Sequence, residues 1–243
     1  MKILGVIPAR YASTRLPGKV LLPIAGKPMI QHVWERTKKS KLLSDVWIAA
    51  DDQKIMEAAK EFGAKAVLTS VHHQSGTDRI AEAVKNIKVD IVVNIQGDEP
   101  LIDVRVIDAL VKVLLKNKNY PMATVIKRID RSDDIHNPNI VKVVVDAHQD
   151  ALYFSRSEIP FNRDRDNGVD YFKHLGIYAY RKNFLLRLTK MPPSRLENIE
   201  KLEQLRVLEA GYKIKTILTD VETIGVDTAE DLKKVEKRLS KTI

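Results

Sequence analysis

The sequence predicts an α/β fold built on a parallel sheet. Over the first 119 residues, short apolar runs alternate with amphipathic segments, and the links between them are short. This repetition favours parallel strands joined by right-handed helical crossovers. The chain has 243 residues and is 44% hydrophobic, which is enough to bury a sizeable core. Because ligands of such sheets bind beyond the carboxyl ends of the strands, we expect a site in the loops there.

The first half of the chain supplies four strands and four helices in this prediction. The strands are short apolar runs of the kind that parallel sheets bury, at 2–7, 46–50, 64–68 and 90–95. The helices are marked by a proline at the first helical position or by capping side chains. They are expected over 28–39 from Pro28, from Asp51 or Asp52 to Gly63, from Thr77 to about residue 87, and from Asp103 to about residue 116.

After residue 120 the alternation of strands and helices loosens. Strands with little helix between them are predicted at 122–127, 141–146, 151–154, 171–180 and 213–218, with a charged loop at 162–170. Helices are predicted at 198–210 and 228–239. The chain is therefore divided into a core at 1–119, an insertion at 120–180, and a return to the core sheet with a C-terminal helix at 181–243.

The charge pattern predicts a local anion site and no nucleic-acid-binding face. The formal net charge is +9, but basic and acidic residues are mixed over most of the chain, as on solvated helix faces. The N-terminal segment differs, because five basic residues precede the first acidic residue, Glu35. These are Lys2, Arg10, Arg15, Lys19 and Lys27.

Composition excludes other classes of protein. Cysteine is absent, so disulfides and thiolate metal sites are excluded. No apolar run approaches the ~20 residues that span a bilayer. The apolar stretch at the N-terminus is too short for the core of a signal sequence. We expect a cytoplasmic protein that binds neither a membrane nor nucleic acid.

The loop at 7–19, directly after the first predicted strand, carries Arg10, Arg15 and Lys19. A Pro-Gly pair shapes a tight turn, so that backbone N–H groups and the three cations can face a triphosphate. The loop has neither the Walker A pattern nor the GxGxxG pattern. A surface loop with solvated basic residues explains the same residues equally well.

Two aspartates are candidates for holding a divalent cation. Asp98 follows a glycine at the end of the fourth predicted strand, a place suited to holding Mg²⁺ against phosphates, although a simple Gly-Asp turn is the alternative. Asp227 precedes the last predicted helix, where Thr228 and Asp231 form a capping-box pattern. Asp227 is then either a second metal carboxylate or an acidic residue favoured by the helix dipole.

Two further segments carry polar side chains that suit ligand binding. Ser75, Gly76 and Arg79 stand at a predicted helix start and could read a nucleotide base by hydrogen bonds, although a plain helix N-terminus explains them too. Arg156 and His174 could bind the carboxylate of an acceptor, although single residues of this kind are more often structural.

Seven segments taken together are far more specific than any one of them. They are, in chain order, IPARYASTRLPGK, HQSGT, NIQGDEP, YFSR, HLGIY, LEQLRVLE and GVDT. This set closely resembles the 3-deoxy-manno-octulosonate (Kdo) cytidylyltransferase family, the CMP-Kdo synthetases, over essentially the whole chain. The opening segment is shared with CMP-sialic acid synthetases and other sugar nucleotidyltransferases, whereas the segments around Arg156, His174 and Gln204 favour Kdo.

The resemblance implies a fold and an activity. The fold is a three-layer α/β/α, Rossmann-like nucleotide-diphospho-sugar transferase fold with a mixed, mostly parallel sheet. Within it, 1–119 would bind the nucleotide, and 120–180 would carry acceptor binding and a homodimer contact. The activity is conversion of CTP and Kdo to CMP-Kdo and pyrophosphate, for lipopolysaccharide biosynthesis, by in-line attack of the anomeric hydroxyl on the α-phosphorus with Mg²⁺ as cofactor. The alternative is a CMP-sialic acid synthetase or a cytidylyltransferase for another 2-keto sugar acid.

The resemblance also implies roles for individual residues. The nucleotide would be bound by Pro8, Ala9, Arg10, Arg15, Lys19, Ser75, Gly76, Arg79 and Gln96. Kdo would be bound by Arg156, Arg163, His174, Tyr178, Glu203 and Gln204. Asp98 and Asp227 would hold Mg²⁺, and the catalytic set would be Lys19, Arg10, Asp98 and Asp227.

Overall fold

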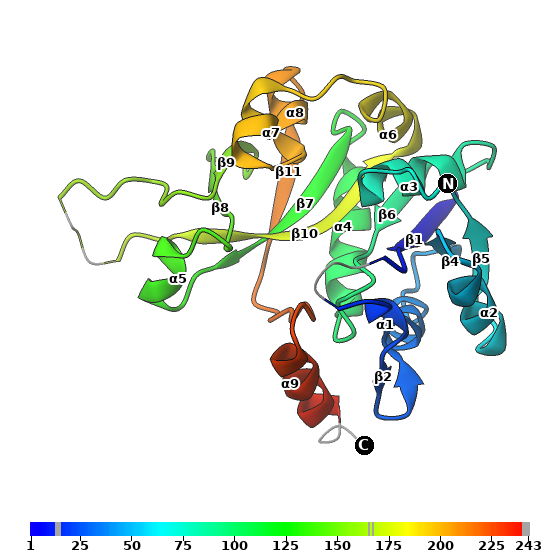
Figure 1. The fold of residues 1–243 in the computed structure, drawn as a ribbon. Coiled ribbons are helices and arrows are strands. Elements are labelled where there is room, and N and C mark those ends of the chain that lie inside the picture. Colours follow the sequence, from blue (N-terminus) through cyan, green and yellow to red (C-terminus); the bar gives the residue numbers. More distant parts are fainter. Residues whose placement is uncertain (13–15, 165, 167, 240–243) are drawn as a thin grey trace.

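The structure, a computed structural model, describes residues 1–12, 16–164, 166 and 168–239. Its main feature is one mixed sheet with the strand order β11-β7-β10-β6-β1-β4-β5, and β8 and β9 extend it beside β10 (Figure 1). β1 pairs in parallel with β4 and β6, and β4 pairs in parallel with β5. β10 is antiparallel to both β6 and β7, and β11 is parallel to β7. The mixed, mostly parallel sheet is therefore confirmed.

The strand bounds follow the apolar runs of the sequence. Central strands are buried along their whole length, as β6 is, which explains why they contain no alternation of polar and apolar residues. The strands of the main sheet are β1 (Ile3–Ala9), β4 (Asp45–Ala50), β5 (Lys65–Leu68), β6 (Ile91–Asn94), β7 (Met122–Arg128), β8 (Lys142–Val145), β9 (Ala151–Ser155), β10 (Phe172–Arg181) and β11 (Ile214–Thr219). A separate two-stranded hairpin pairs β2 (Pro23–Ile24) with β3 (Lys27–Pro28).

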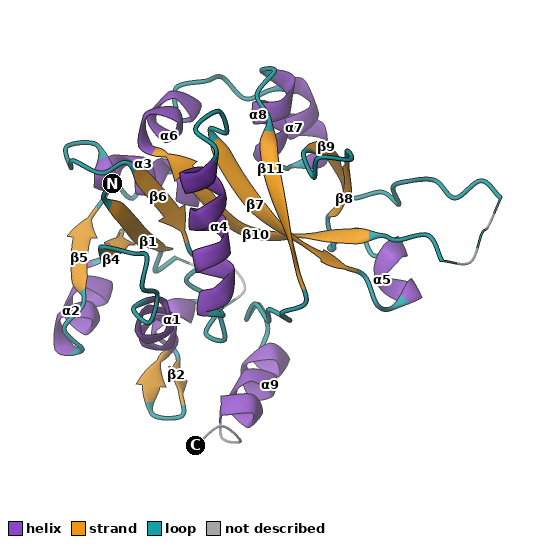
Figure 2. Ribbon diagram, turned by 180° about the vertical axis from the view of Figure 1, so that it is seen from behind, coloured by secondary structure: helices purple, strands orange, loops and turns teal. Residues whose placement is uncertain are grey.

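Helices cover both faces of the sheet, which confirms the three-layer α/β/α arrangement. One hydrophobic cluster joins the sheet to α1 (Met29–Thr37), α2 (Gln53–Glu61) and α4 (Val104–Lys116), and α4 crosses the near face in Figure 2. A second cluster joins the opposite face to α3 (Gly76–Val84), α6 (Lys182–Leu188) and α8 (Gln204–Glu209). The remaining helices are η1 (Lys19–Leu21), α5 (Ser132–His136), α7 (Arg195–Glu200) and α9 (Ala229–Leu239).

Two helix predictions were wrong in detail. The segment at 198–210 was expected as one helix, but Lys201 takes the left-handed conformation (φ 55°) and separates α7 from α8. Ser75, not Thr77, caps α3, because its side chain accepts a hydrogen bond from the backbone N–H of Asp78. The caps by Asp52 and Asp103 and the Thr228–Asp231 capping box are confirmed.

The three segments into which the sequence was divided share this sheet. β7 and β10, from 120–180, lie between β11 and β6. The connection between β9 and β10 extends away from the sheet, at the left of Figure 1. No helix in the described part of the chain is both long enough and apolar enough to cross a membrane.

Candidate functional site

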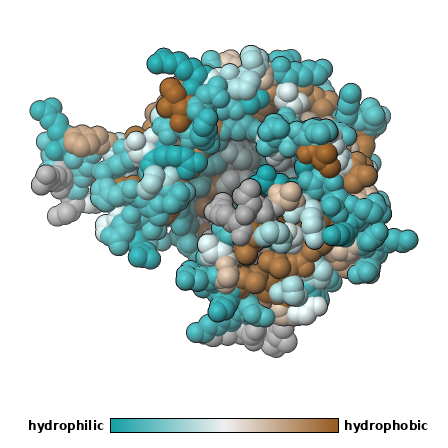
Figure 3. Space-filling view, in the orientation of Figure 1, coloured by the Kyte–Doolittle hydropathy of each residue, from teal (hydrophilic) through white to brown (hydrophobic). Residues whose placement is uncertain are grey.

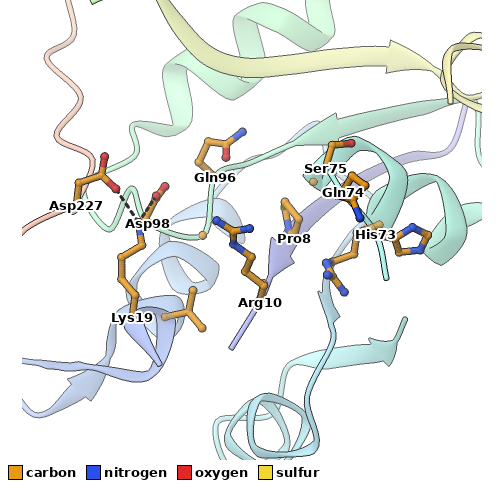
Figure 4. A pocket seen from close by; sticks show the side chains of 14 residues that line it. Pro8, Arg10, Lys19, His73, Gln74, Ser75, Gln96, Asp98 and Asp227 are labelled. Atoms are coloured by element: carbon orange, nitrogen blue, oxygen red, sulfur yellow. Dashed lines mark hydrogen bonds and ion pairs between the residues drawn. The ribbon is translucent and has the colours of Figure 1, made fainter. Parts of the chain in front are cut away.

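A cavity of about 430 Å³ opens at the carboxyl ends of β1 and β6, where the alternating pattern predicted a site. Figure 3 shows the surface hollowed near the middle of this face, and Figure 4 shows the side chains that line the cavity. Most of them are polar. The lining residues are Pro8, Ala9, Arg10, Lys19, Val20, His73, Gln74, Ser75, Gly76, Arg79, Gln96, Gly97, Asp98 and Asp227.

The wall of the cavity around Pro8 depends on two glycines. A Cβ atom on Gly97 would lie 3.0 Å from the carbonyl oxygen of Pro8, and one on Gly76 would lie 3.3 Å from its ring. Larger residues would therefore push apart the end of β1, the turn after β6 and the start of α3. The close packing brings Pro8, Gly76 and Gly97 together at the cavity wall.

Lys19 lies between the two predicted metal carboxylates. Its Nζ is 2.6 Å from Oδ2 of Asp98 and 3.0 Å from Oδ1 of Asp227, as Figure 4 shows. Burial acts to lower the pKa of Lys19, but the charges and hydrogen bonds of both aspartates outweigh it and leave the pKa raised. The ammonium is therefore charged, and the cluster joins residues that are far apart in sequence.

The last part of the chain is fixed beside Asp98 by a backbone hydrogen bond and an apolar cluster. The N–H of Val226 donates to the carbonyl of Asp98 at 2.9 Å, which holds the neighbouring Asp227 at the cavity. Val226, which precedes α9, and Val235, which lies in it, are fully buried against Ile24 and Met29 of the N-terminal segment. The position of Asp227 therefore depends on the docking of α9.

The residues at this cluster fit a divalent cation. Two carboxylates already hold one cation, the ammonium of Lys19, between them. Among the described residues there is no group of three or more His, Cys, Asp or Glu side chains that could hold a metal alone. Mg²⁺ is usually held by one or two carboxylates together with substrate phosphates and waters, so two aspartates suffice. In the neighbouring Glu99, burial and then the charge of Asp98 raise the pKa to about 8.

The start of α3 forms the opposite side of the cavity. Ser75 caps the helix, and its hydroxyl also donates to the carboxylate of Asp78 at 2.9 Å. Arg79 is 4% exposed and is already paired, because its guanidinium donates to Asp51 at 3.1 Å and to the hydroxyl of Thr69 at 2.7 Å. Arg79 therefore lines the cavity as a fixed cation.

The predicted nucleotide residues are placed together, with one outside the described residues. Pro8, Ala9, Arg10, Lys19, Ser75, Gly76, Arg79 and Gln96 all line the cavity. The side chain of Arg10 is exposed and lies in the cavity between Lys19 and Pro8 (Figure 4). Arg15 lies outside the residues that the structure describes. The contacts of these residues with a nucleotide stay predictions.

Four polar residues of the predicted acceptor site form a second group, which the hydrogen bond from Gln96 to Gly176 links to the cavity. They are His174, Tyr178, Glu203 and Gln204. His174 Nε2 lies 2.9 Å from the hydroxyl of Thr124, and the His174 ring lies 5.4 Å from that of Tyr178. The Thr124 hydroxyl donates to the Ile177 carbonyl at 2.9 Å, so it accepts from Nε2–H of a neutral imidazole. Burial lowers the pKa of His174 to about 3, which agrees with that neutral state.

Tyr178 connects this group to α8, and two hydrogen bonds connect the group to the cavity. The Tyr178 hydroxyl donates to Oε1 of Gln204 at 3.3 Å, and Nε2 of the buried Gln204 has no partner in the described part of the chain. Glu203 accepts a hydrogen bond of 2.5 Å from Thr77, next to the start of α3. Gln96 Nε2 donates to the carbonyl of Gly176 at 2.7 Å, in the irregular part of β10.

The two remaining predicted acceptor residues differ in placement. Arg156 follows β9 and is held by backbone carbonyls, with Nε 2.8 Å from the oxygen of Glu200 and Nη1 2.9 Å from that of Pro138. Arg163 is exposed on the segment between β9 and β10. Within the described ranges, no hydrogen bond or ion pair joins Arg163 to the other predicted residues.

Several lining residues had no signal specific enough to single them out. His73, Gln74 and Gly97 lie within the HQSGT and NIQGDEP segments, and Val20 directly follows the loop at 7–19, but residues of these types also suit ordinary loops. Thr124 lies in the interior of β7, where a threonine is a normal strand residue. Its contact with His174 depends on strand pairing, which one sequence does not reveal.

Comparison with known proteins gives consistent results over the whole chain. The family model described as Cytidylyltransferase matches residues 4–217. A Geobacter metallireducens protein named 3-deoxy-manno-octulosonate cytidylyltransferase is 49% identical over an alignment of 251 positions, gaps included. The alignment covers 99% of each chain. A Syntrophobacter fumaroxidans protein of the same name is 52% identical and covers 97% of this chain and 96% of its own.

Solved structures agree with the sequence comparisons. A structure described as CMP:2-keto-3-deoxy-manno-octonic acid synthetase complexed with CTP superposes with a TM-score of 0.96, at 44% identity and with full coverage of both chains. A 4-diphosphocytidyl-2C-methyl-D-erythritol synthase structure from Anaerococcus prevotii gives a TM-score of 0.63 at 14% identity, which shows a shared fold alone. The expected Rossmann-like nucleotidyltransferase fold is confirmed.

Proposed function

Because the chain belongs to the 3-deoxy-manno-octulosonate cytidylyltransferase family, we propose that it transfers CMP from CTP to Kdo and releases pyrophosphate. The observation that carries the proposal is the cluster of Lys19 between Asp98 and Asp227, at the edge of a polar cavity beyond the strand ends. The alternative acceptor, a sialic acid, is not favoured, since the relatives reported above carry the Kdo name.

The reaction is an in-line displacement at phosphorus. The anomeric oxygen of Kdo forms a bond to the α-phosphorus of CTP and its proton passes to solvent, while the bond to the bridging oxygen breaks and pyrophosphate takes its electron pair. Little covalent chemistry is required of the protein, so positioning and charge neutralisation dominate. Lys19 and Arg10 are the cations that line the cavity beside the carboxylate pair, and they are assigned to the phosphates.

Mg²⁺ is proposed as the cofactor, held by Asp98 and Asp227. When bound there, it would neutralise phosphate charge and make the α-phosphorus more electrophilic. The hydrogen bond from Val226 to the carbonyl of Asp98 keeps Asp227 beside Asp98, and the Lys19 ammonium occupies the place between the two carboxylates until the metal displaces it. Ser75, Gly76 and Arg79 are assigned to the cytosine side of the nucleotide, and Gln96 to the boundary between the two substrates.

Kdo is placed by this proposal against the second polar group. His174 and Tyr178 offer fixed hydrogen-bonding side chains, and Gln204 offers a buried amide donor that has no partner among the described residues. Arg156 is assigned to the Kdo carboxylate, because a guanidinium binds that group in two parallel hydrogen bonds. Glu203 and Arg163 complete the proposed set. A cytoplasmic homodimer that supplies lipopolysaccharide synthesis remains part of the proposal.

Pyrophosphate release from CTP and Mg²⁺ tests the function directly. Reactions with Kdo, with N-acetylneuraminate and without acceptor are compared at equal protein concentration. We expect release with Kdo alone. Release with N-acetylneuraminate alone would keep the reaction class but replace the acceptor, and release with neither acid would refute the proposal. A reaction without enzyme is the blank, and Asp98→Asn, which removes one proposed metal carboxylate while preserving shape, is expected to release pyrophosphate much more slowly than the parent.

A further inference from the structure

Lys142 in β8 is a fully buried lysine that points at three backbone carbonyls. Its side chain is 0% exposed. The ammonium donates to the carbonyls of Asn137 at 2.9 Å, Ile140 at 2.7 Å and Arg156 at 2.6 Å. In the part of the chain that the structure describes, no carboxylate lies within ion-pair distance of it.

Burying an ammonium in this way lowers the stability of the fold unless its hydrogen bonds compensate, so we expect the charge to have a function. Removing an ammonium from water is unfavourable, and burial followed by the nearby guanidinium of Arg156 lowers the pKa of Lys142. Methionine has a similar length and would fill the same space without this cost. The three carbonyls come from two separate stretches of chain, the turn at 137–140 and the residue after β9. The ammonium therefore fastens these two stretches together.

Of the two stretches that Lys142 holds, one contains Arg156 and the other contacts its guanidinium. The carbonyl of Arg156 accepts from Lys142, and its N–H donates to the carboxylate of Glu200 at 2.9 Å. The Arg156 guanidinium donates hydrogen bonds to the carbonyl of Glu200 at 2.8 Å and to that of Pro138 at 2.9 Å. Pro138 lies in the turn that Lys142 fixes. Lys142 thus sets both the backbone of Arg156 and one of the two carbonyls that orient its side chain.

We propose that Lys142 is a positioning residue for the acceptor, which acts by holding Arg156 in the conformation that binds the acceptor's carboxylate. The inference rests on the proposed function, in which Arg156 binds that carboxylate. A long arginine side chain loses rotamer freedom when it binds, and prior ordering reduces that loss. The benefit is therefore confined to acceptor binding. Binding of CTP, at the carboxyl ends of β1 and β6, does not depend on Lys142.

The test compares steady-state kinetics of the full-length enzyme and three variants. Lys142→Met removes the ammonium, and Arg156→Met removes the guanidinium. Lys182→Met is the matched control, because the Lys182 ammonium also donates to a backbone carbonyl, that of Ile87, at the opposite end of β6. We expect Lys142→Met to raise the KM for Kdo about tenfold, with the KM for CTP and kcat within about twofold, and Lys182→Met to match the parent. If Lys142→Met is not folded, Lys142→Gln retains amide donors at a shorter length and is expected to show a smaller rise.

A double variant identifies the route of the effect. If Lys142 acts through Arg156, Lys142→Met should have no further effect on the KM for Kdo in the Arg156→Met background. A persisting effect there, or an equal rise in the KM for CTP, would overturn the inference in favour of general destabilisation. If Arg156→Met raises the KM for Kdo and Lys142→Met does not, the inference about Lys142 is overturned and the role of Arg156 stands. An unchanged KM in Arg156→Met would instead remove the role given to Arg156 under the proposed function, and this inference with it.

Discussion

Replacing Lys19 by methionine should change Mg²⁺ binding and turnover in opposite directions. The ammonium of Lys19 lies 2.6 Å from Asp98 and 3.0 Å from Asp227. A divalent cation held by the same two carboxylates must therefore displace it. During transfer, by contrast, the displaced ammonium is available to the phosphates, where positive charge lowers the barrier.

The size of both effects follows from the exposure of the cluster. The side chains of Asp98 and Asp227 are 32% and 47% exposed, so each contact is screened by solvent. Ion pairs at such exposure contribute about 0.2–1 kcal/mol each, so the two together stabilise the ligand-free site by about 1 kcal/mol. Losing this competition should raise the affinity of the free enzyme for Mg²⁺ about fivefold. Loss of one charged group aimed at the phosphates should lower kcat about 10²–10³-fold.

Two measurements on one variant give the answer. Calorimetric titration of Mg²⁺ into the nucleotide-free enzyme reports the first effect, and pyrophosphate release at saturating CTP, Kdo and Mg²⁺ reports the second. Lys27→Met is the matched control, because Lys27 pairs with Glu35 at 2.8 Å outside the cavity lining and should change neither value.

Either effect can fail separately. Equal or weaker Mg²⁺ binding by Lys19→Met would refute the competition between the ammonium and the metal for Asp98 and Asp227. An unchanged kcat would refute the assignment of Lys19 to the phosphates.

Three further predictions concern single side chains. Asp98→Asn should lower kcat by about 10²-fold at saturating Mg²⁺, and normal pyrophosphate release would remove Asp98 from the metal site. Gly97→Ala places a Cβ 3.0 Å from the carbonyl oxygen of Pro8, so it should destabilise the fold by about 1–3 kcal/mol and raise the KM for CTP. Gly225→Ala is the control, because its Cβ would meet no atom within 4 Å, and it should change neither value. Thermal unfolding and steady-state kinetics measure the two effects. His174 has its pKa lowered to about 3 from 6.5, so its neutral form dominates in the folded state and the unfolded chain takes up the proton first. Its contribution to stability is therefore complete above pH 6.5 and is lost as pH falls towards 3, by at most about 1.4 kcal/mol per pH unit. Denaturant unfolding between pH 6.5 and 3 should show a smaller pH dependence in His174→Gln than in the parent, by up to this slope.

The order of strands and helices in the first half was predictable from local signals. Apolar runs bounded by caps such as Asp52 and Asp103 are encoded within a few residues, and both caps are observed. The break at Lys201 was not predictable, because leucines continue on one face through 198–210 and the left-handed residue is a lysine, not a glycine. Ser75 and Thr77 are both good caps by type, and the choice between them depends on the tertiary contact of Thr77 with Glu203.

The candidate site was predictable where residues follow strand ends. Asp98 and Arg10 are found at the cavity because the ends of parallel strands meet at one edge of the sheet. What the sequence does not contain is pairing between distant segments. The contact of Lys19 with Asp227 spans 208 positions, and the carbonyl cage of Lys142 depends on how β8 lies beside β9. Neither has a local pattern.

The seating of α9 has a consequence for synthesis of the enzyme on the ribosome. A nascent chain folds from its N-terminal side as it emerges, so β1, β6 and Lys19 can assemble long before residue 227 is made. At that stage Ile24 and Met29 lack Val226 and Val235, two of their apolar partners, because these two residues are synthesised much later. Until those residues dock and Val226 reaches the carbonyl of Asp98, the cavity has one of the two carboxylates to which the proposed function assigns Mg²⁺. Under the proposed function, the metal site is therefore complete only after the segment around Asp227 has been synthesised and has docked beside Asp98.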